Sequence, residues 1–387
     1  MKKSYNFLRK IVIPEFVYGI GAISLVGHYA KNFGAKKALI VTDLGVLKAG
    51  ILKNVTLSLE SEKISYIIFS DVSENPRIYE VEKGASVYEK NNCDIIIAVG
   101  GGSPIDCAKT IGITYTNKKN PLEFIGVDEV DIPGPPLICI PTTSGSSADV
   151  SQFAILNDNS KNVKLAIISK SVVSDVSIID PKTTITMTER LTAATGMDAL
   201  SHAVEAYVSN ASSSITDLHA LAAMPLIVNN IMPAIKDPEN LEYRSNMMLG
   251  SLYAGIAFSN ASLGLTHAMA HSLGGLLDLP HGICNSLLLE HVVDFNYYYA
   301  TEKYKDIGNI FGLNLENYSD EECKYKIVSF LSDLRKSIGI TGTIGTLGVT
   351  KKEIPSLSIN AFNDPCIVTN PRTATLNDIE MVYKNAL

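Results

Sequence analysis

The spacing of apolar and polar positions differs between the two halves of the chain. In the first half, short runs rich in Ile, Val and Leu, at 36–43, 65–72, 93–100 and 136–143, are separated by stretches such as 78–91, which has the spacing of an amphipathic helix. The runs at 93–100 and 136–143 are apolar on both faces, which is typical of strands in a buried parallel sheet. Strands that alternate with helices predict βαβ units and a doubly wound sheet.

The pattern changes near residue 185. Strand-like runs end there, and long helical patterns rich in Ala, Leu and Met follow. The pair Asp180-Pro181, followed by Thr183 and Thr184, is a suitable boundary. Because 387 residues exceed what one ordinary hydrophobic core organises, two domains are expected. We therefore predict an α/β domain over 1–184 and an all-helical domain over 185–387.

Composition narrows the class of protein and its partners. A hydrophobic content of 46% excludes a disordered chain. The net charge is −7 and no basic run is present, so we expect no nucleic-acid partner and no anionic membrane partner. The six Cys form no CxxC pair and several lie in apolar runs, as reduced thiols of a cytoplasmic protein do. We expect neither a signal peptide nor an apolar run long enough to cross a bilayer.

Five of the seven His lie between residues 202 and 281. Asp198 and His202 are four residues apart, as are His267 and His271, and His281 follows in LPHG. On a helix, a spacing of four places two side chains on one face. Two facing helices could therefore direct a carboxylate and several imidazoles to one point, and these donors suit Fe²⁺ or Zn²⁺. Taken one at a time each residue has a structural explanation, but the cluster favours a metal site.

A glycine loop follows the strand predicted at 93–100. It consists of Gly100, Gly101, Gly102, Ser103 and Pro104. Ser103 suits an N-cap and Asp106 the acidic position of a capping box, so a helix is expected to begin here. Glycines allow close approach of the backbone, and a helix N-terminus attracts anions, which together make a diphosphate site. The alternative is an ordinary tight turn between strand and helix.

Two further segments end predicted strands with polar side chains. Thr142 and Thr143 open a loop of small residues that follows the strand ending at Pro141. This loop either contacts a phosphate or ribose or is an ordinary polar loop. Asp43 ends the strand at 36–43. Its carboxylate either accepts hydrogen bonds from a ribose and repels a 2′-phosphate, or caps the helix that follows.

Together these motifs resemble the iron-containing (group III) alcohol dehydrogenase family, and most of all its branch with 1,3-propanediol dehydrogenase and lactaldehyde reductase. The resemblance covers nearly the whole chain, from KKALIVTD through VGGGSPIDCAK, LTAATGMDALSHAVEAY and LPHG to TNPRTATLNDIEMVY. It implies a dinucleotide-binding α/β domain with a parallel sheet, an all-α metal-binding domain, and a site in the cleft between them.

The resemblance also implies roles for individual residues. The family's iron ligands correspond to Asp198, His202, His267 and His281, and His271 corresponds to a histidine near the metal that does not bind it. The positions that contact the nucleotide correspond to Asn75, Gly100, Gly101, Gly102, Ser103, Thr142, Thr143 and Lys164. Asp43 joins this set because it ends a predicted strand, not because of the resemblance. The positions that line the substrate pocket correspond to Phe153, Phe258 and Cys366.

The function expected from the resemblance is reversible hydride transfer between a short primary alcohol or diol, or its aldehyde, and NAD(H). The cofactors would be Fe²⁺, with Zn²⁺ as the alternative, and NAD, with NADP as the alternative. His271 either carries a proton to solvent or packs beside the metal. The expected protein is a cytoplasmic homo-oligomer, dimeric or larger.

Several positions depart from the family pattern. Ala148-Asp149 replaces Thr-Glu or Ser-Glu, Glu290 replaces a proline, and Phe153 replaces a polar residue. These departures leave the alcohol or aldehyde open. Two other functions fit the fold: a metal-dependent lyase resembling dehydroquinate synthase, and a non-catalytic or regulatory member. The absence of a Lys/Arg cluster near 190–290 argues against the first, and the intact ligands argue against the second.

Overall fold

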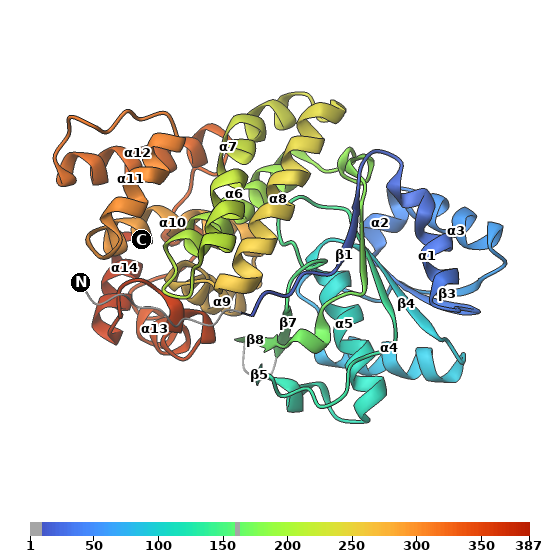
Figure 1. Ribbon diagram of the computed structural model, residues 1–387. Helices are drawn as coiled ribbons and strands as arrows, with labels where there is room; N and C mark the ends of the chain where they lie inside the picture. The colour runs from blue at the N-terminus through green and yellow to red at the C-terminus, as the bar shows by residue number, and fades with distance from the viewer. Residues whose placement is uncertain (1–9, 159–162) are drawn as a thin grey trace.

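The computed structural model describes residues 10–158 and 163–387, and places a sheet-containing half beside a helical half (Figure 1). The chain is blue to green in the first half and yellow to red in the second. The predicted change from alternating strands and helices to helices alone near residue 185 is confirmed, because each regular element from 189 onward is a helix.

A parallel six-stranded sheet organises the first half. Its strand order is β1-β9-β6-β4-β2-β3, and the neighbouring strands pair in parallel. The strands are β1 (Glu15–Tyr18), β2 (Lys37–Val41), β3 (Ser65–Phe69), β4 (Ile95–Gly100), β6 (Leu137–Pro141) and β9 (Val176–Ile179). The predicted doubly wound parallel sheet is therefore confirmed.

Helices cover both faces of this sheet. Alternate residues of β4 point to opposite sides, so that Ile96 and Ala98 belong to one core and Ile95 and Ile97 to the other. The first core is completed by α4 (Ile78–Lys90) and α5 (Gly102–Asn117), the second by α1 (Val26–Asn32) and α3 (Leu52–Ser61), and the short α2 (Leu44–Lys48) follows β2. Burial on both sides explains why β4 lacks polar positions.

A second, three-stranded sheet was not predicted from the sequence. It has the order β5-β8-β7, in which β7 (Phe153–Asp158) and β8 (Val163–Ile168) are antiparallel and β5 (Gly126–Val127) is parallel to β8. The 153–168 region mixes apolar residues with Asn, Asp and Lys, so its pattern does not distinguish it from a loop.

The second half is a bundle of helices around a single apolar core. Helices α6, α8, α9 and α10 contribute most of the fully buried positions, and the remaining helices surround them (Figure 1). The helices are α6 (Glu189–Val208), α7 (Ser214–Lys236), α8 (Leu241–Ala261), α9 (Leu265–Leu277), α10 (His281–Asn296), α11 (Thr301–Ile310), α12 (Asp320–Ser337), α13 (Ile354–Phe362) and α14 (Leu376–Asn385).

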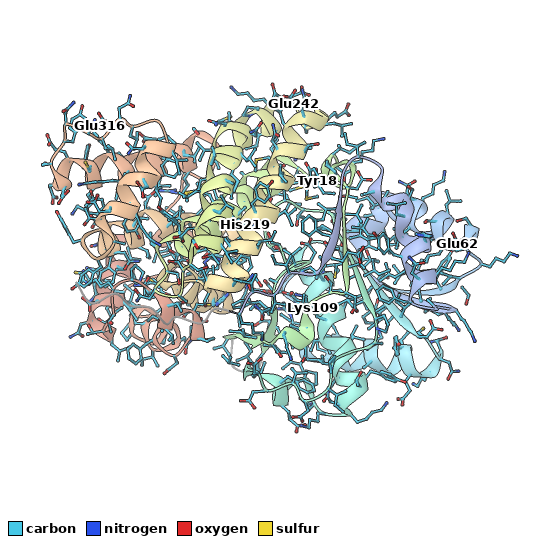
Figure 2. The ribbon with its side chains drawn as sticks, viewed as in Figure 1. Tyr18, Glu62, Lys109, His219, Glu242 and Glu316 are labelled. Atoms are coloured by element: carbon cyan, nitrogen blue, oxygen red, sulfur yellow. The ribbon has the colours of Figure 1, made fainter. Side chains whose placement is uncertain are left out.

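Hydrogen bonds join the two halves at several points. Tyr18 of β1 donates from its hydroxyl to the carbonyl of Ser245 on α8, at 2.9 Å, and Figure 2 shows Tyr18 where the sheet meets that helix. On the same helix, the side chain of Ser259 accepts from the backbone N–H of Gln152 at 3.1 Å. These contacts join the first half of the chain to α8.

Two of the departures from the family pattern serve internal packing. Glu290 on α10 forms a buried ion pair with Arg335 on α12, with Nη2 of Arg335 3.1 Å from Oε1 of Glu290. Asp149 accepts a hydrogen bond from the Ser177 hydroxyl at 2.5 Å, inside the protein. Neither of these two side chains lines the cleft, whereas Ala148, which precedes Asp149, does.

Two expectations about the start of α5 are wrong. Helix α5 begins at Gly102 with Gly101 as its N-cap, not at Ser103, and Asp106 accepts from the N–H of Ile155 instead of completing a capping box. Helix α7 is long and apolar enough to cross a membrane by length and composition only, and Asn229 and Asn230 interrupt its apolar residues, so the expectation of no uninterrupted apolar run of that length is not contradicted. It packs against α6 and α8, and a third of its apolar window is buried.

Candidate metal and nucleotide site

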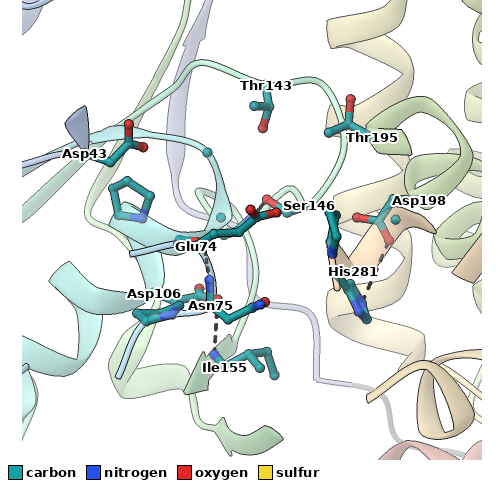
Figure 3. Close-up of a pocket in the computed structure, with 18 of the residues that line it drawn as sticks. Asp43, Glu74, Asn75, Asp106, Thr143, Ser146, Ile155, Thr195, Asp198 and His281 are labelled. Atoms are coloured by element: carbon teal, nitrogen blue, oxygen red, sulfur yellow. Dashed lines mark hydrogen bonds and ion pairs between the residues drawn. The ribbon is translucent and has the colours of Figure 1, made fainter. Parts of the chain in front are cut away.

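A cleft of about 640 Å³ lies between the two halves and is lined by residues from both. It extends from the carboxyl ends of the parallel strands, the edge at which open α/β sheets bind ligands, to helices α6, α9 and α10. Figure 3 shows Asp43 on one side of this cleft and Asp198 and His281 on the other, with Thr143 and Glu74 between. The cleft thus has a sheet side and a helix side.

The helix side brings the predicted metal ligands together. Asp198 and His202 lie one turn apart on α6, His267 lies on α9, and His281 is the first residue of α10. Oδ1 of Asp198 is 3.9 Å from Nε2 of His202, 3.8 Å from Nε2 of His267 and 3.9 Å from Nε2 of His281. Donors at ~2.1 Å from a tetrahedral ion lie ~3.5 Å apart, so these separations fit a metal.

The four side chains are not placed identically. The donor atoms of Asp198, His267 and His281 all lie within 4.8 Å of one another. His202 stands at the edge of this group, with its ring stacked 4.7 Å from that of His267 and 4.2 Å from that of Phe258. Burial lowers the pKa of His202 to about 4 and the pKa of His281 well below its ordinary value. Both rings are therefore neutral, which is the form that binds metals.

Glu205 was not predicted from the sequence, and it orients one of these ligands. It lies on α6, is 4% exposed, and accepts a very short hydrogen bond from Nδ1 of His267 and another, at 2.6 Å, from the N–H of Thr266. With the proton on Nδ1, the lone pair of His267 is on Nε2, which faces Asp198. A carboxylate behind a histidine is a common support for metal sites.

Asn285 is a second residue that the sequence did not single out. Its amide Nδ2 donates to Oδ1 of Asp198 at 2.7 Å and lies 3.0 Å and 3.2 Å from Nε2 of His267 and His281. Its position four residues after His281 on α10 places both side chains on the same face of that helix. The amide therefore orients Asp198, and its second hydrogen is available to one of the two rings.

The fit of a divalent metal rests on the chemistry of this donor set. One carboxylate oxygen and three unprotonated imidazole nitrogens converge in a buried space, and that combination suits Fe²⁺ or Zn²⁺. Within the described part of the chain, Asp198 has one neutral hydrogen-bond donor, Asn285, and no Lys or Arg as an ion-pair partner. A buried carboxylate without a cation is unfavourable, and a metal would supply the missing positive charge.

His271 lies one turn after His267 and lines the cleft beside these ligands. Its ring stacks on that of His281 at 5.1 Å, and its Nδ1 is 2.8 Å from Oδ2 of Asp364. Burial favours the neutral acid, but the interaction with the imidazole of His271 and the hydrogen bonds to the carboxylate outweigh burial and lower the pKa of Asp364. Asp364 was also absent from the residues predicted from the sequence.

The sheet side of the cleft is formed by the glycine loop and the N-terminus of α5. No side chain caps this helix end in the described structure, so its first N–H groups face the cleft. A Cβ on Gly101 would lie 3.2 Å from the Thr143 side chain, and one on Gly102 would lie 3.0 Å from Ser146. Side chains would therefore fill the space in which a diphosphate would approach the backbone.

Asn75 connects this loop to the helix side. Its backbone N–H donates to the Ser103 hydroxyl at 3.3 Å, and its side chain accepts from Nζ of Lys164 at 2.7 Å and donates to Asp278 at 2.9 Å. Arg77 forms an ion pair with the same Asp278, at 2.9 Å. Burial lowers the pKa of Lys164. The predicted residues Asn75, Ser103 and Lys164 thus lie next to one another.

Asp43, Thr142 and Thr143 also line the cleft. Oδ1 of Asp43 accepts from the N–H of Val46 at 2.9 Å, so Asp43 is the N-cap of α2. The structure therefore confirms that Asp43 caps a helix. Contact of Asp43 with a ribose stays a prediction.

Phe153 and Phe258 line the cleft next to His202, with their ring centroids 5.6 Å apart. Cys366 is fully buried and is not among the described residues that line the cleft. Burial raises the pKa of its thiol well above the ordinary value. The two aromatic rings give the helix side an apolar wall, whereas the role of Cys366 in substrate binding stays a prediction.

The fold defines a class of protein in which a parallel-sheet half and a helical half border one cleft. Residues 14–181 match the family model for iron-containing alcohol dehydrogenase, and residues 192–387 match the C-terminal model of the Fe-containing alcohol dehydrogenase family. This chain belongs to the iron-containing alcohol dehydrogenase family, and it is an oxidoreductase by that membership.

Individual relatives match over almost their whole length. The chain is 38% identical to 1,3-propanediol dehydrogenase of Klebsiella pneumoniae, covering 99% of this chain and 100% of the relative. It is 37% identical to NAD-dependent methanol dehydrogenase of Bacillus methanolicus, covering 97% and 98%. Its fold superimposes on the crystal structure of 1,3-propanediol oxidoreductase with a TM-score of 0.95, at 38% identity, covering 98% and 100%.

Proposed function

We propose that this protein catalyses reversible hydride transfer between a short primary alcohol or diol, or the corresponding aldehyde, and NAD(H). The observation that carries the proposal is the single cleft, which has a helix N-terminus without a side-chain cap on one side and a carboxylate with three imidazoles on the other. Among its relatives, the NAD-dependent methanol dehydrogenase and the 1,3-propanediol dehydrogenase act on substrates of this kind.

The metal would be held by Asp198, His202, His267 and His281. When bound, it would act as a Lewis acid that stabilises negative charge on the substrate oxygen. Glu205 keeps the proton of His267 on Nδ1, so that Nε2 stays a lone-pair donor. Phe153 and Phe258 exclude water from the carbon that loses or gains the hydride, because their rings form the wall beside His202.

The nucleotide would be held by Gly100, Gly101, Gly102, Ser103, Asn75, Thr142, Thr143 and Lys164, with Asp43 at the ribose. When bound, it would carry the hydride on its nicotinamide ring. The N–H groups at the start of α5 would neutralise the diphosphate. His271, which lines the cleft, would accept the proton of an alcohol on Nε2 and pass it toward solvent.

The finer assignments belong to the same proposal. We favour Fe²⁺ over Zn²⁺ because of the family, and NAD over NADP because of the carboxylate at Asp43. We propose a domain boundary between residues 184 and 185, a cytoplasmic location, a homo-oligomer, and neither nucleic acid nor membrane as a partner. Lys164 is the only Lys or Arg among the described residues that line the cleft, which disfavours a lyase acting on a phosphorylated substrate.

An assay of two properties on one preparation tests the proposal. Protein purified without oxygen should contain about one metal ion per chain and should oxidise NADH with a panel of short aldehydes. His267→Ala should lose both the metal and the activity, whereas the control His219→Ala, whose ring lies outside the cleft on α7, should keep both.

Two results would contradict the proposal. A protein with metal and bound NADH but no turnover of any aldehyde or alcohol would favour a non-catalytic member. A His267→Ala variant that binds metal as tightly as the parent would move the metal site elsewhere.

A further inference from the structure

The histidine at position 271 has a partner on a distant part of the chain. Asp364 lies just before the short 3₁₀ helix η7 (Pro365–Thr369), 93 residues after His271, and its Oδ2 is 2.8 Å from Nδ1 of the imidazole. The side chains are 6% and 8% exposed. His271 lines the cleft, whereas Asp364 is not among the described residues that do. The carboxylate therefore lies behind the ring, away from the substrate.

Asp364 is itself fixed by the backbone. Its second oxygen, Oδ1, accepts from the N–H of Cys366 at 2.8 Å, which caps η7. The surrounding segment is bound to α9, because the Ser272 hydroxyl donates to the carbonyl of Leu357 at 2.9 Å. Tyr383 of α14 donates to the carbonyl of Met269 on α9 at 2.8 Å. The distance between carboxylate and imidazole is thus set by packing on both sides.

The hydrogen bond decides which ring nitrogen of His271 carries the proton. A carboxylate only accepts, so Nδ1 donates and Nε2 keeps its lone pair. Nε2 lies on the opposite edge of the ring from Asp364 and therefore on the cleft side. The ring is also held by stacking on His281, with an interplanar angle of 15°. His271 is therefore presented to the cleft as a hydrogen-bond acceptor.

We propose that Asp364 is a positioning residue for the reaction: it holds His271 in the tautomer and orientation in which Nε2 accepts the proton of the alcohol. In oxidation, the O–H bond of the alcohol would break and its proton would move to Nε2, while bound NAD⁺ would supply the acceptor for the hydride that leaves the carbon. In reduction the same proton returns to the oxygen. This inference rests on the proposed function of the cleft.

Asp364→Asn tests the tautomer directly. The Asn oxygen can still accept from the N–H of Cys366, so its amide NH₂ faces Nδ1 of His271 and donates to it. Nδ1 must then be the acceptor and Nε2 must carry the proton, which prevents Nε2 from accepting another. We expect kcat to fall by on the order of 10²-fold, with unchanged metal content and an unchanged Kd for NADH. Asp364→Glu, which keeps an accepting carboxylate, should recover part of the loss.

A double variant separates positioning from general stability. If Asp364 acts through His271, Asp364→Asn should reduce kcat by less than about twofold in a His271→Ala background, because the group that it orients is gone. A full additional loss in that background would overturn the inference, as would loss of metal from Asp364→Asn or an unchanged kcat.

A measurement without turnover distinguishes this inference from the proposed function. ¹⁵N NMR of imidazole-labelled, Zn²⁺-loaded protein should show the proton of His271 on Nδ1 in the parent and on Nε2 in Asp364→Asn. If the tautomer changes as expected but the parent turns over no alcohol or aldehyde, the proposed function fails and the role of Asp364 in orienting His271 stands. If the tautomer is the same in both proteins, the role of Asp364 is refuted.

Discussion

At the scale of single residues, the cleft depends on polar side chains whose partners come from elsewhere in the sequence. Glu205 orients His267, Asn285 holds Asp198, and Asp364 holds His271. The first two contacts are buried and the third is partly buried, and an unmade buried hydrogen bond costs about 1–3 kcal/mol. Replacements at these positions should therefore change the geometry of the site as well as its stability.

Asp43 allows a test of cofactor choice that preserves the fold. Asn caps helices as well as Asp does, so Asp43→Asn should keep the start of α2 while removing the charge. We expect the preference for NAD(H) over NADP(H), measured as the ratio of kcat/KM values, to narrow by roughly tenfold, the effect of ~1.4 kcal/mol of removed repulsion. An unchanged ratio would mean that Asp43 only caps the helix.

Asp106 should make stability depend on pH. Burial raises its pKa to about 7, although the charge of Lys109 opposes the shift. A raised folded-state pKa means that the protonated form is favoured in the native protein, so this contribution to stability is complete below the unfolded pKa and is lost as pH rises through about 7.

Asp106→Asn cannot ionise and should not show this loss. Between pH 5 and pH 7, the free energy of unfolding of the cofactor-free variant should rise relative to that of the parent by about 2 kcal/mol. Chemical denaturation of both proteins at each pH measures the difference. A constant difference across this range would show that Asp106 titrates normally.

At the scale of elements, the arrangement of the proposed metal ligands depends on how closely α10 crosses α6. Gly282 follows His281, and a Cβ at this position would lie 2.2 Å from the carbonyl oxygen of Ala194 on α6. That oxygen is backbone and cannot move aside without displacing its helix. The absence of a side chain at Gly282 therefore allows His281 to reach Asp198.

Gly282→Ala should push the two helices apart. We expect a loss of about 1–3 kcal/mol in the free energy of unfolding and weaker metal binding, measured by denaturation and by competition with a chelator. Gly112→Ala on α5 is the matched control, because its Cβ would have ordinary contacts from 3.4 Å outward. Metal affinity equal to that of the parent in Gly282→Ala would show that the helices tolerate the change.

At the scale of the whole molecule, the two halves are bound to each other but carry different parts of the site. The parallel sheet has its own cores on both faces, and the helical half has a separate one. The four proposed metal ligands belong to the helical half, on α6, α9 and α10. Metal binding should therefore stabilise one half more than the other.

Removal of the metal tests this division. A free metal concentration of one hundred times the Kd adds about 2.7 kcal/mol to the free energy of unfolding. Loss of the metal leaves Asp198 buried without a cation. We expect a chelator to increase hydrogen exchange in α6, α9 and α10 while β2, β4 and β6 keep their protection. Equal changes in both halves would mean that the metal stabilises the molecule as one unit.

The sequence by itself determined the classes of element and the chemistry of the site. Apolar runs without polar positions specified a sheet covered on both faces, and the change of spacing near 185 specified a helical half, because these periodicities follow from local geometry. The spacing of Asp198 with His202 and of His267 with His271 placed each pair on one helix face. The fold class and the family inferred from these motifs are confirmed.

Only the tertiary structure decided which elements face each other. Glu205 and Asp364 lie 62 and 93 residues from the histidines that they hold, so no local pattern connects them. The same limit applies to the unpredicted β7–β8 pair and to the first residue of α5, where packing outweighed capping preference. A local pattern states which side of an element is apolar, whereas the partner that covers it depends on how the whole chain packs.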